Sequence, residues 1–385
     1  MPKKIHLFNP QHDLSLAAGE MEYHAPESAM QLASDLSLLP LWYAEGGDTV
    51  ISDTDAVLPP PVREVNVSAI NDLTVGEDDR LVPWGWDRSV RMQFLRAGVP
   101  EDLLPSAGHI DRIRAMSHRR TAGRAMEYIK GRATDMRFPD TAVELASFRE
   151  IEEFVAARGE AVLKAPWSGS GRGVFWCSGQ MAQSLAGWCT RVIQRQGCVM
   201  GEPALDKVQD FAMEFHCSGG TAAFAGYSLF STSGGVYRGN RMMSDAMIEA
   251  ALAEYVPVPA LHTVRGLLTE FLSAEIAPHY SGYVGVDMMV YRDGGELLVN
   301  PAVEINLRMT MGMVARTVYD RHVAAGKNGW FHIGHQPPGL LAAQDREMRT
   351  HMPLKTEGNR IASGYCPLVP VTESSVYTAF IIIDE

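Results

Sequence analysis

The segment GVDMMVYRDGGELLVNPAVEIN, residues 285–306, combines two apolar runs with a turn between them. Residues 285–290 predict a strand, Asp293-Gly294-Gly295 is a strong hairpin signal, and the returning strand ends in Glu304-Ile305-Asn306. Side chains alternate along a strand, so Glu304 and Asn306 share one face. With Asp287 they present three oxygen donors on facing strands, which suit one or two Mg²⁺ ions. A polar hairpin without a metal is the alternative interpretation.

A lysine and a glycine-rich loop form the second informative segment. Residues 161–165 predict a strand that carries Lys164, the loop Ser168-Gly169-Ser170-Gly171-Arg172-Gly173 follows, and residues 174–176 predict the next strand. A strand lysine supplies a fixed positive charge, and glycines let backbone N–H groups approach phosphate oxygens closely. The pattern therefore predicts a hairpin that closes over a triphosphate, with a glycine-rich surface turn as the plainer alternative. A Walker loop fits poorly because the lysine precedes the glycines, and the HRD and DFG motifs of protein kinases are absent.

Four segments follow one another in a fixed order along the chain. They are Ser117-His118-Arg119-Arg120, Lys164 with its glycine loop, Gly201-Glu202-Pro203 with Asp210, and Asp287 with Glu304-Ile305-Asn306. In this order they resemble the ATP-grasp superfamily, over roughly residues 111–312. The resemblance implies an α/β protein in which two α+β subdomains clasp a nucleotide, preceded by a small α/β lobe. The expected parts are an N-terminal lobe at 1–110, a first subdomain with the glycine loop at 111–198, and a second subdomain with the metal site and a C-terminal extension at 199–385.

Local patterns predict the elements of these parts. Apolar runs at 38–43 and 55–58 add to a modest N-terminal α/β lobe. The expected strands lie at 5–8, 161–165, 174–176, 198–201, 211–217, 222–230, 285–291, 296–299 and 375–383, and the expected helices at 89–97, 110–130, 147–157, 181–196 and 261–277.

The resemblance also implies roles for individual residues. Asp287, Glu304 and Asn306 match the metal-binding positions of the superfamily. Arg119 stands where members usually carry a lysine that contacts the α-phosphate, and Arg120 is a near alternative. A bulge at 300–302 is expected to absorb a gap about four residues longer than is typical between Asp287 and Glu304. The nucleotide-binding prediction comprises Arg119, Lys164, Ser168, Gly169, Ser170, Gly171, Gly173, Gly201, Glu202 and Asp210. The catalytic prediction comprises Lys164, together with two arginines chosen by their position: Arg308, two residues past Asn306 on the same face, and Arg241, which follows a Gly-Gly turn.

The activity that the resemblance implies is that of an ATP-dependent ligase. A substrate carboxylate would attack the γ-phosphorus of ATP, and an amine or thiol would then displace phosphate from the acyl phosphate. The implied cofactors are ATP and Mg²⁺, with Mn²⁺ as an alternative, and a homodimer is a mild expectation. A small-molecule kinase of the same fold and a nucleotide-binding module without turnover remain as alternatives.

Charge and cysteine content restrict the partners and the compartment. The net charge of −12 argues against nucleic acid and anionic lipid as partners. No apolar stretch reaches membrane-spanning length, and five cysteines without a CxxC spacing favour a reducing cytoplasm.

Two N-terminal motifs, Asn9-Pro10-Gln11-His12-Asp13 and Trp84-Gly85-Trp86-Asp87, have no assigned role. Each fits a ligand-contacting loop and a structural turn equally well.

Overall fold

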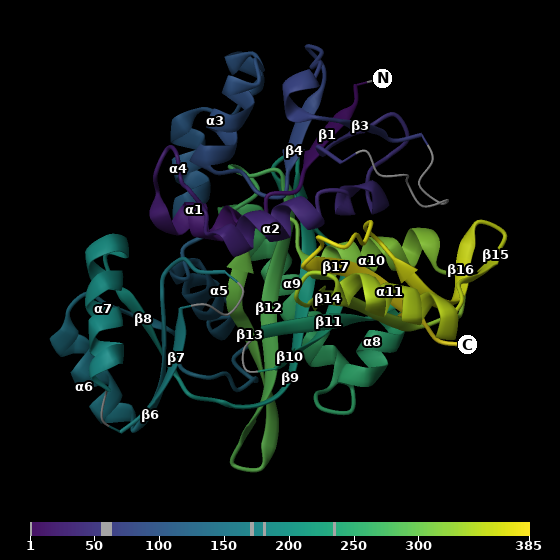
Figure 1. Cartoon of the computed structure of the whole chain (residues 1–385). Coiled ribbons are helices and arrows are strands. Elements are labelled where there is room, and N and C mark those ends of the chain that lie inside the picture. The colour runs from purple at the N-terminus through teal and green to yellow at the C-terminus, as the bar shows by residue number, and fades with distance from the viewer. Residues whose placement is uncertain (1, 55–63, 170–172, 180–181, 234–235) are drawn as a thin grey trace.

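The computed structural model describes residues 2–54, 64–169, 173–179, 182–233 and 236–385. Within this part of the chain the strands form three sheets, of four, nine and four strands (Figure 1). No helix in the described ranges has both the length and the apolar character needed to cross a bilayer. The apolar run at 55–58 lies outside the described residues.

The N-terminal sheet is parallel and has the order β3-β2-β1-β4. The strand expected at residues 5–8 is β1, whereas the apolar run at 38–43 forms a 3₁₀ turn, Leu39–Trp42, with Pro40 in its first turn. Proline lacks the N–H that a ladder needs, and the leucines and tryptophan of this turn are buried without a strand. The bounds are β1 Lys4–Leu7, β2 Thr49–Ile51, β3 Asn66–Ser68, β4 Arg80–Pro83, α1 His12–Ala18, α2 Glu27–Asp35 and α3 Arg88–Arg96, with further 3₁₀ turns at Ile70–Asp72 and Glu101–Leu103.

A helix pattern expected over residues 110–130 is divided into two helices. Helix α4 (Ala107–Met116) ends at Ser117, whose hydroxyl donates a hydrogen bond to Ile113 O at 2.9 Å, and α5 (Arg120–Lys130) begins three residues later. A serine that bonds its own backbone competes with continuation of the helix. The break leaves Arg119 at the start of α5.

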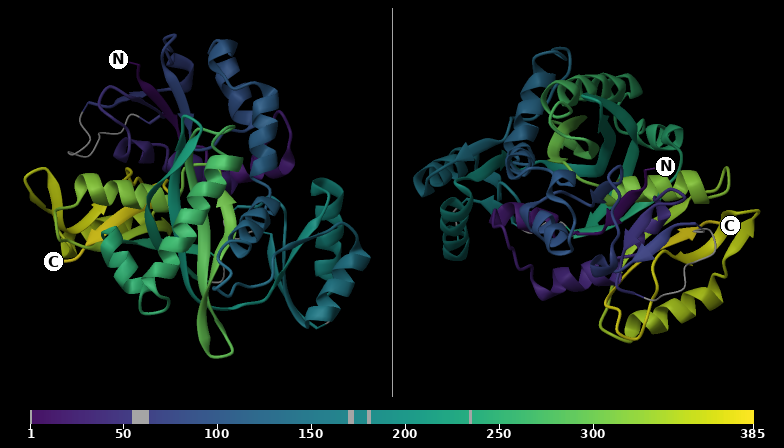
Figure 2. Two further views of the ribbon diagram at one scale, coloured as in Figure 1. Left: turned by 180° about the vertical axis from the view of Figure 1, so that it is seen from behind. Right: turned by 90° about the horizontal axis from the view of Figure 1, so that it is seen from above.

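The outer sheet has the order β5-β8-β6-β7, and its neighbours are antiparallel. Strand β6 (Glu160–Lys164) pairs with β7 (Val174–Ser178), which confirms the hairpin around the glycine-rich loop. The first and last strands, β5 (Val143–Leu145) and β8 (Val199–Pro203), are neighbours, so the chain enters and leaves this unit side by side. Figures 1 and 2 show α6 (Phe148–Arg158) and α7 (Gln183–Gln196) on the side of the outer sheet turned away from the rest of the protein.

The central sheet runs β13-β12-β9-β10-β11-β14-β17-β16-β15. On one face, Phe211, Met213 and Phe215 of β9 are buried in an apolar cluster with residues of α5, α8 and α9. Alternation along the strand places Ala212 and Glu214 on the other face. The bounds of these elements are β9 Asp206–Ser218, β10 Thr221–Ser233, β11 Val236–Met242, α8 Asp245–Leu252, α9 Val258–Glu275, β12 Gly282–Asp293, β13 Glu296–Asn306 and α10 Met311–His322.

The residues beyond 325 extend the central sheet. Strand β17 confirms the strand expected at 375–383, and it lies between β14 and β16. Trp42 Nε1 donates to Leu368 O at 2.6 Å, and Asp35 Oδ2 accepts from the backbone N–H of Val376 at 2.9 Å. These bonds join the N-terminal lobe to the end of the chain. The bounds are β14 Gly329–His335, α11 Leu340–His351, β15 Lys355–Glu357, β16 Arg360–Pro367 and β17 Tyr377–Ile383.

Candidate functional site

The hairpin of β12 and β13 brings the three predicted metal-binding residues together. Asp287 stands opposite Glu304 in the ladder, and Asn306 Nδ2 donates to Asp287 Oδ2 at 3.2 Å. Met289 pairs with Asn300, so between these two pairs one residue of β12 stands opposite three residues of β13, 301–303. This register shift overlaps the bulge expected at 300–302. Burial raises the pKa of Asp287 to about 7, and the charge of Glu304 adds to the rise. A divalent cation would relieve that cost, so the donor set fits Mg²⁺.

Arg119 links β13 to the glycine-rich loop. Its guanidinium donates to Ala165 O at 3.0 Å and to Ser168 Oγ at 3.1 Å, and its third nitrogen lies 3.0 Å from Glu304 Oε2. Only 6% of this arginine is exposed. Arg120, the alternative from the sequence, is half exposed and pairs with Glu144 instead.

Lys164 is paired with Glu202 across the outer sheet. The Lys164 Nζ lies 2.5 Å from Glu202 Oε2, and both side chains are largely buried. The base of the loop is closed by the Ala165 N–H, which donates to Gly173 O at 2.9 Å. Ser170 and Gly171, also predicted to bind nucleotide, lie outside the described residues.

Arg308 makes a bidentate ion pair with Asp13 of the N-terminal lobe. Its Nε and Nη2 donate to the Asp13 carboxylate at 2.8–3.1 Å, and Nη2 also donates to Asn306 Oδ1 at 3.1 Å. Burial opposes ionisation of Asp13, yet Arg308 and His12 lower its pKa overall. Three cations of the site, Arg119, Lys164 and Arg308, are thus each paired with a carboxylate.

Two pockets flank the Arg119–Glu304 pair. The first lies between the edge of the outer sheet, α5 and the bulge of β13, and the second lies between Asp13, the base of the loop and the end of β13. The first is lined by Arg119, Ala122, Gly123, Met126, Asp140, Ala142, Glu202, Pro203, Leu205, Asn300, Ala302 and Val303. The second is lined by Asp13, Leu16, Ser117, Trp167, Ser168, Glu304, Ile305, Asn306 and Leu307.

Three other predicted residues have different surroundings. Asp210 lies one strand away from Asp287 and accepts from Lys207 Nζ at 2.6 Å and Thr232 Oγ1 at 2.7 Å. Gly201 packs closely against the side chains of Leu145 and Phe154, since a Cβ there would lie 2.8 Å from each. The structure does not bring Arg241 to the site.

Strand parity explains the position of Arg241. Its guanidinium lies over the Trp330 ring, 4.6 Å from the centroid, whereas the preceding Asn240 donates to Ser228. Because successive side chains alternate, a one-residue difference in position turns a strand residue to the opposite face. The predicted catalytic role of Arg241 therefore stays a prediction without structural support.

Glu214 is a buried carboxylate that sequence reasoning missed. Its Oε1 accepts from Thr310 Oγ1 at 2.8 Å, and its Oε2 has no partner among the described residues. Burial raises its pKa to about 8, and Asp287 adds to the rise. The available signal was strand alternation, since Glu214 stands on the same face of β9 as the Ala212 that pairs with Asp287.

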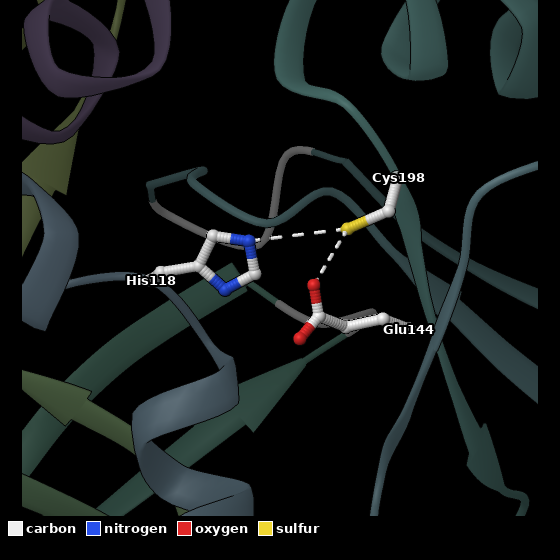
Figure 3. A group of neighbouring side chains, drawn as sticks. All are labelled: His118, Glu144 and Cys198. Atoms are coloured by element: carbon white, nitrogen blue, oxygen red, sulfur yellow. Dashed lines mark hydrogen bonds between the residues drawn. The ribbon is translucent and has the colours of Figure 1, made fainter.

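His118, Glu144 and Cys198 form a further group with metal-ligating atoms (Figure 3). Cys198 Sγ lies 3.9 Å from His118 Nε2 and 3.6 Å from Glu144 Oε2. Both imidazole nitrogens already face N–H donors of Arg120, the backbone N–H at Nδ1 and the guanidinium at Nε2. Burial and the neighbouring arginines lower the pKa of His118 to about 4. The group is a hydrogen-bonded contact between the α4–α5 junction and the outer sheet.

Comparisons with solved structures define the fold. No protein-family model and no curated protein matches the sequence. A biotin carboxylase–β-γ-ATP complex from Campylobacter jejuni matches with a TM-score of 0.52 at 13% identity, over 100% of this chain and 88% of that chain. An ADP complex of N5-carboxyaminoimidazole synthetase from Staphylococcus aureus and an ATP complex of carboxyaminoimidazole ribonucleotide synthase from Aspergillus clavatus each match with a TM-score of 0.50 at 10% identity, over 100% of this chain and 94% of theirs.

The chain has the ATP-grasp fold, so the resemblance expected from the sequence is confirmed at the level of the fold. At these identities the matches establish architecture alone. Substrate and chemistry have to be argued from the residues of the site.

Proposed function

We propose that the protein is an ATP-dependent ligase that activates a carboxylate as an acyl phosphate for attack by an amine or a thiol. The observation that carries the proposal is the cluster of Asp287, Glu304 and Asn306 between two pockets, with Arg119 bonded to Glu304. The first pocket would hold the adenine beside Glu202 and Pro203. Asp210 would face the ribose, and the triphosphate would cross Arg119 and Lys164 toward the second pocket.

The internal ion pairs determine how this site would accept its ligands. Asp287, Glu304 and Asn306 would hold Mg²⁺, which would supply positive charge beside the phosphates of the nucleotide. When Glu304 binds the metal ion, Arg119 loses this partner and can pair with a phosphate. Lys164 can likewise leave Glu202 and pair with a second phosphate. Binding would thus replace internal carboxylates by ligand oxygens without leaving a buried cation unpaired.

The second pocket would hold the substrate carboxylate. Asn306, Ser168 and Glu304 line it, and Arg308 is bonded to both Asp13 and Asn306. Arg308 would stabilise charge on the transferring phosphoryl group, and no protein nucleophile is needed because the substrate oxygen attacks in line.

All five cysteines are buried without a disulfide, which supports a reducing compartment.

Ligand-dependent thermal stabilisation tests this proposal directly. The melting temperature should rise with Mg-ATP and with Mg-ADP, and much less with Mg²⁺ alone. Lys164→Ala should weaken the nucleotide effect, whereas Lys355→Ala, at an exposed pair with Glu385 on the last strands, should leave it unchanged.

Phosphate release in the same samples then identifies the reaction. Release that requires one acid together with one amine or thiol supports a ligase. Phosphorylation of an acceptor hydroxyl without condensation would replace the ligase by a kinase. No stabilisation by any nucleotide would refute the nucleotide site itself.

A further inference from the structure

The two unassigned N-terminal motifs form one buried network. Asn9 Nδ2 donates to Gly85 O at 2.8 Å, and the Gly85 N–H donates to Asn9 Oδ1 at 3.3 Å. Asp87 Oδ2 lies 3.3 Å from His12 Nδ1, and Asp87 Oδ1 accepts from Ser15 Oγ at 2.9 Å. All four polar residues are nearly inaccessible to solvent. A network satisfied in this way fixes the position of its members.

The network controls the first turn of α1. His12 and Ser15 both belong to this helix, and Asp87 holds both of them while it caps α3 through the Val90 N–H at 3.0 Å. The His12 ring packs against Gly85, where a Cβ would lie 2.6 Å from the ring. Helix α1 therefore has little freedom to rotate or slide.

Asp13 is the residue that this rigid turn presents to the candidate site. It is the neighbour of His12 in the chain and lines the second pocket. A Cβ on Gly169 of the glycine-rich loop would lie 3.1 Å from the Asp13 Oδ2, so the backbone of Gly169 lies close to the carboxylate. Asp13 thus contacts both Gly169 and Arg308, the arginine two residues after the end of β13.

The ion pair sets the orientation of the Arg308 guanidinium. Asp13 accepts from its Nε and Nη2, Asn306 accepts from Nη2, and Met309 O accepts from Nη1 at 3.2 Å. These bonds engage four of the five N–H groups that an arginine carries. Because a bidentate pair fixes the plane of the guanidinium, Asp13 contributes geometry as well as charge.

We propose that Asp13 is a positioning residue: it holds Arg308 over the phosphoryl-transfer position, so that the Asn9–His12–Ser15–Asp87 network makes the N-terminal lobe part of the active site. The inference rests on the proposed function, because it assigns Arg308 to the γ-phosphate. It predicts that loss of the Asp13 carboxylate affects Mg-ATP and spares Mg-ADP. It also predicts that the effect requires Arg308.

The test measures Mg-ATP and Mg-ADP affinity by calorimetry for the wild type and Asp13→Asn. Mg-ATP affinity should fall by about 10-fold or more, the scale of one charge-assisted hydrogen bond, while Mg-ADP affinity stays within about 2-fold. Asp13→Glu should recover part of the loss. Asp111→Asn is the matched control, since Asp111 forms a bidentate pair with Arg88 in the same lobe, at an exposed position.

A double-mutant cycle shows whether Asp13 acts through Arg308. In an Arg308→Ala background, Asp13→Asn should change Mg-ATP affinity by less than about 2-fold. An equal loss of Mg-ATP affinity in both backgrounds would overturn the proposal. A gain in affinity for the substrate carboxylate in Asp13→Asn would also overturn it, because it would mean that Asp13 competes with the substrate. Ser15→Ala, which loosens the network without removing the carboxylate, should lower Mg-ATP affinity in the same direction and provides the test if Asp13→Asn does not fold.

The outcomes separate this inference from the proposed function. A wild type that binds neither nucleotide would refute the proposed function. A wild type that binds both, with Asp13→Asn indistinguishable from it, would refute the positioning role alone.

Discussion

Replacing Arg119 by lysine tests whether the shape of this cation matters in addition to its charge. Arginine presents three nitrogens to three acceptors, Ala165 O, Ser168 Oγ and Glu304 Oε2, each at 3.0–3.1 Å. A lysine ammonium at this position can keep the charged contact with Glu304. It cannot reach the two acceptors at the base of the loop at the same time.

The expected magnitude follows from the two lost bonds. A hydrogen bond from a charged donor contributes about 1.5–3 kcal/mol, and at 6% exposure water replaces it only in part. Arg119→Lys should therefore lower the free energy of unfolding by about 2–4 kcal/mol. Because the same bonds hold the base of the loop against β13, Mg-ATP affinity should fall by about 10-fold or more, a cost near 1.4 kcal/mol.

Urea unfolding and calorimetry with Mg-ATP measure the two effects. Arg120→Lys is the matched control, since this neighbour is half exposed and its pair with Glu144 contributes at most about 1 kcal/mol. If Arg119→Lys matches the wild type in both assays, the bonds of the Arg119 guanidinium to Ala165 O and Ser168 Oγ do not hold the base of the loop in place. A loss confined to Arg120→Lys would transfer the phosphate contact to Arg120.

Three further predictions concern the same region. Glu304→Gln should abolish Mg²⁺-dependent ATP hydrolysis while the circular dichroism spectrum stays that of the wild type. Burial raises the pKa of Glu214 from 4.5 to about 8, so its stabilising contribution is complete below about pH 4.5 and is lost as the pH rises through about 8. In urea unfolding, the free energy of unfolding of the wild type should therefore be roughly 4 kcal/mol lower at about pH 9 than at about pH 5 through Glu214, and Glu214→Gln should not show this fall. Gly312→Ala should destabilise the fold by about 1–3 kcal/mol, because the added Cβ would clash with Glu214 Oε1. Gly266→Ala is the control, since nothing lies within 4 Å of its Cβ position, and it should stabilise the fold by about 0.5–1 kcal/mol in the same assay.

Each of these has a result that would contradict it. Unchanged turnover in Glu304→Gln would remove this residue from the metal site. Parallel stability profiles of Glu214→Gln and the wild type between the two pH values would mean that Glu214 is ionised throughout. A Gly312→Ala protein as stable as Gly266→Ala would mean that the helix shifts to make room.

The local parts of the site could be predicted from the sequence. The turn at 293–295 specifies a hairpin, and the register from this turn alone would place Asp287 opposite Ala302. The bulge at the register shift, which was also expected, places Asp287 opposite Glu304 instead. The hairpin around the glycine-rich loop follows in the same way from the strands on either side of it. In both cases the two strands are joined by a short turn, so the pairing partner is close in the chain.

The long-range parts could not be predicted. Asp13 and Arg308 are 295 positions apart, and no periodicity or spacing connects them. Their meeting depends on how the N-terminal sheet packs against the central sheet, which is a property of the tertiary structure. Helix α10 was not among the expected helices, although its start had a local signal. Thr310 is its N-cap, and the Thr310 Oγ1 accepts from the Met313 N–H at 2.9 Å.

The neighbouring positions of β5 and β8 have a consequence for the history and the engineering of this protein. Val143 stands opposite Gly201 in the ladder, so the intervening chain returns to within about 5 Å of its starting point. Such a segment can be exchanged like a cassette, because a short linker closes the gap and the strand order of the central sheet stays the same. Recombination at these two points would transfer Lys164 and the glycine-rich loop together while Asp13, Arg308 and the metal-binding strands stay with the recipient. Lys164 and the glycine-rich loop can therefore diverge separately from the Asp13–Arg308 pair.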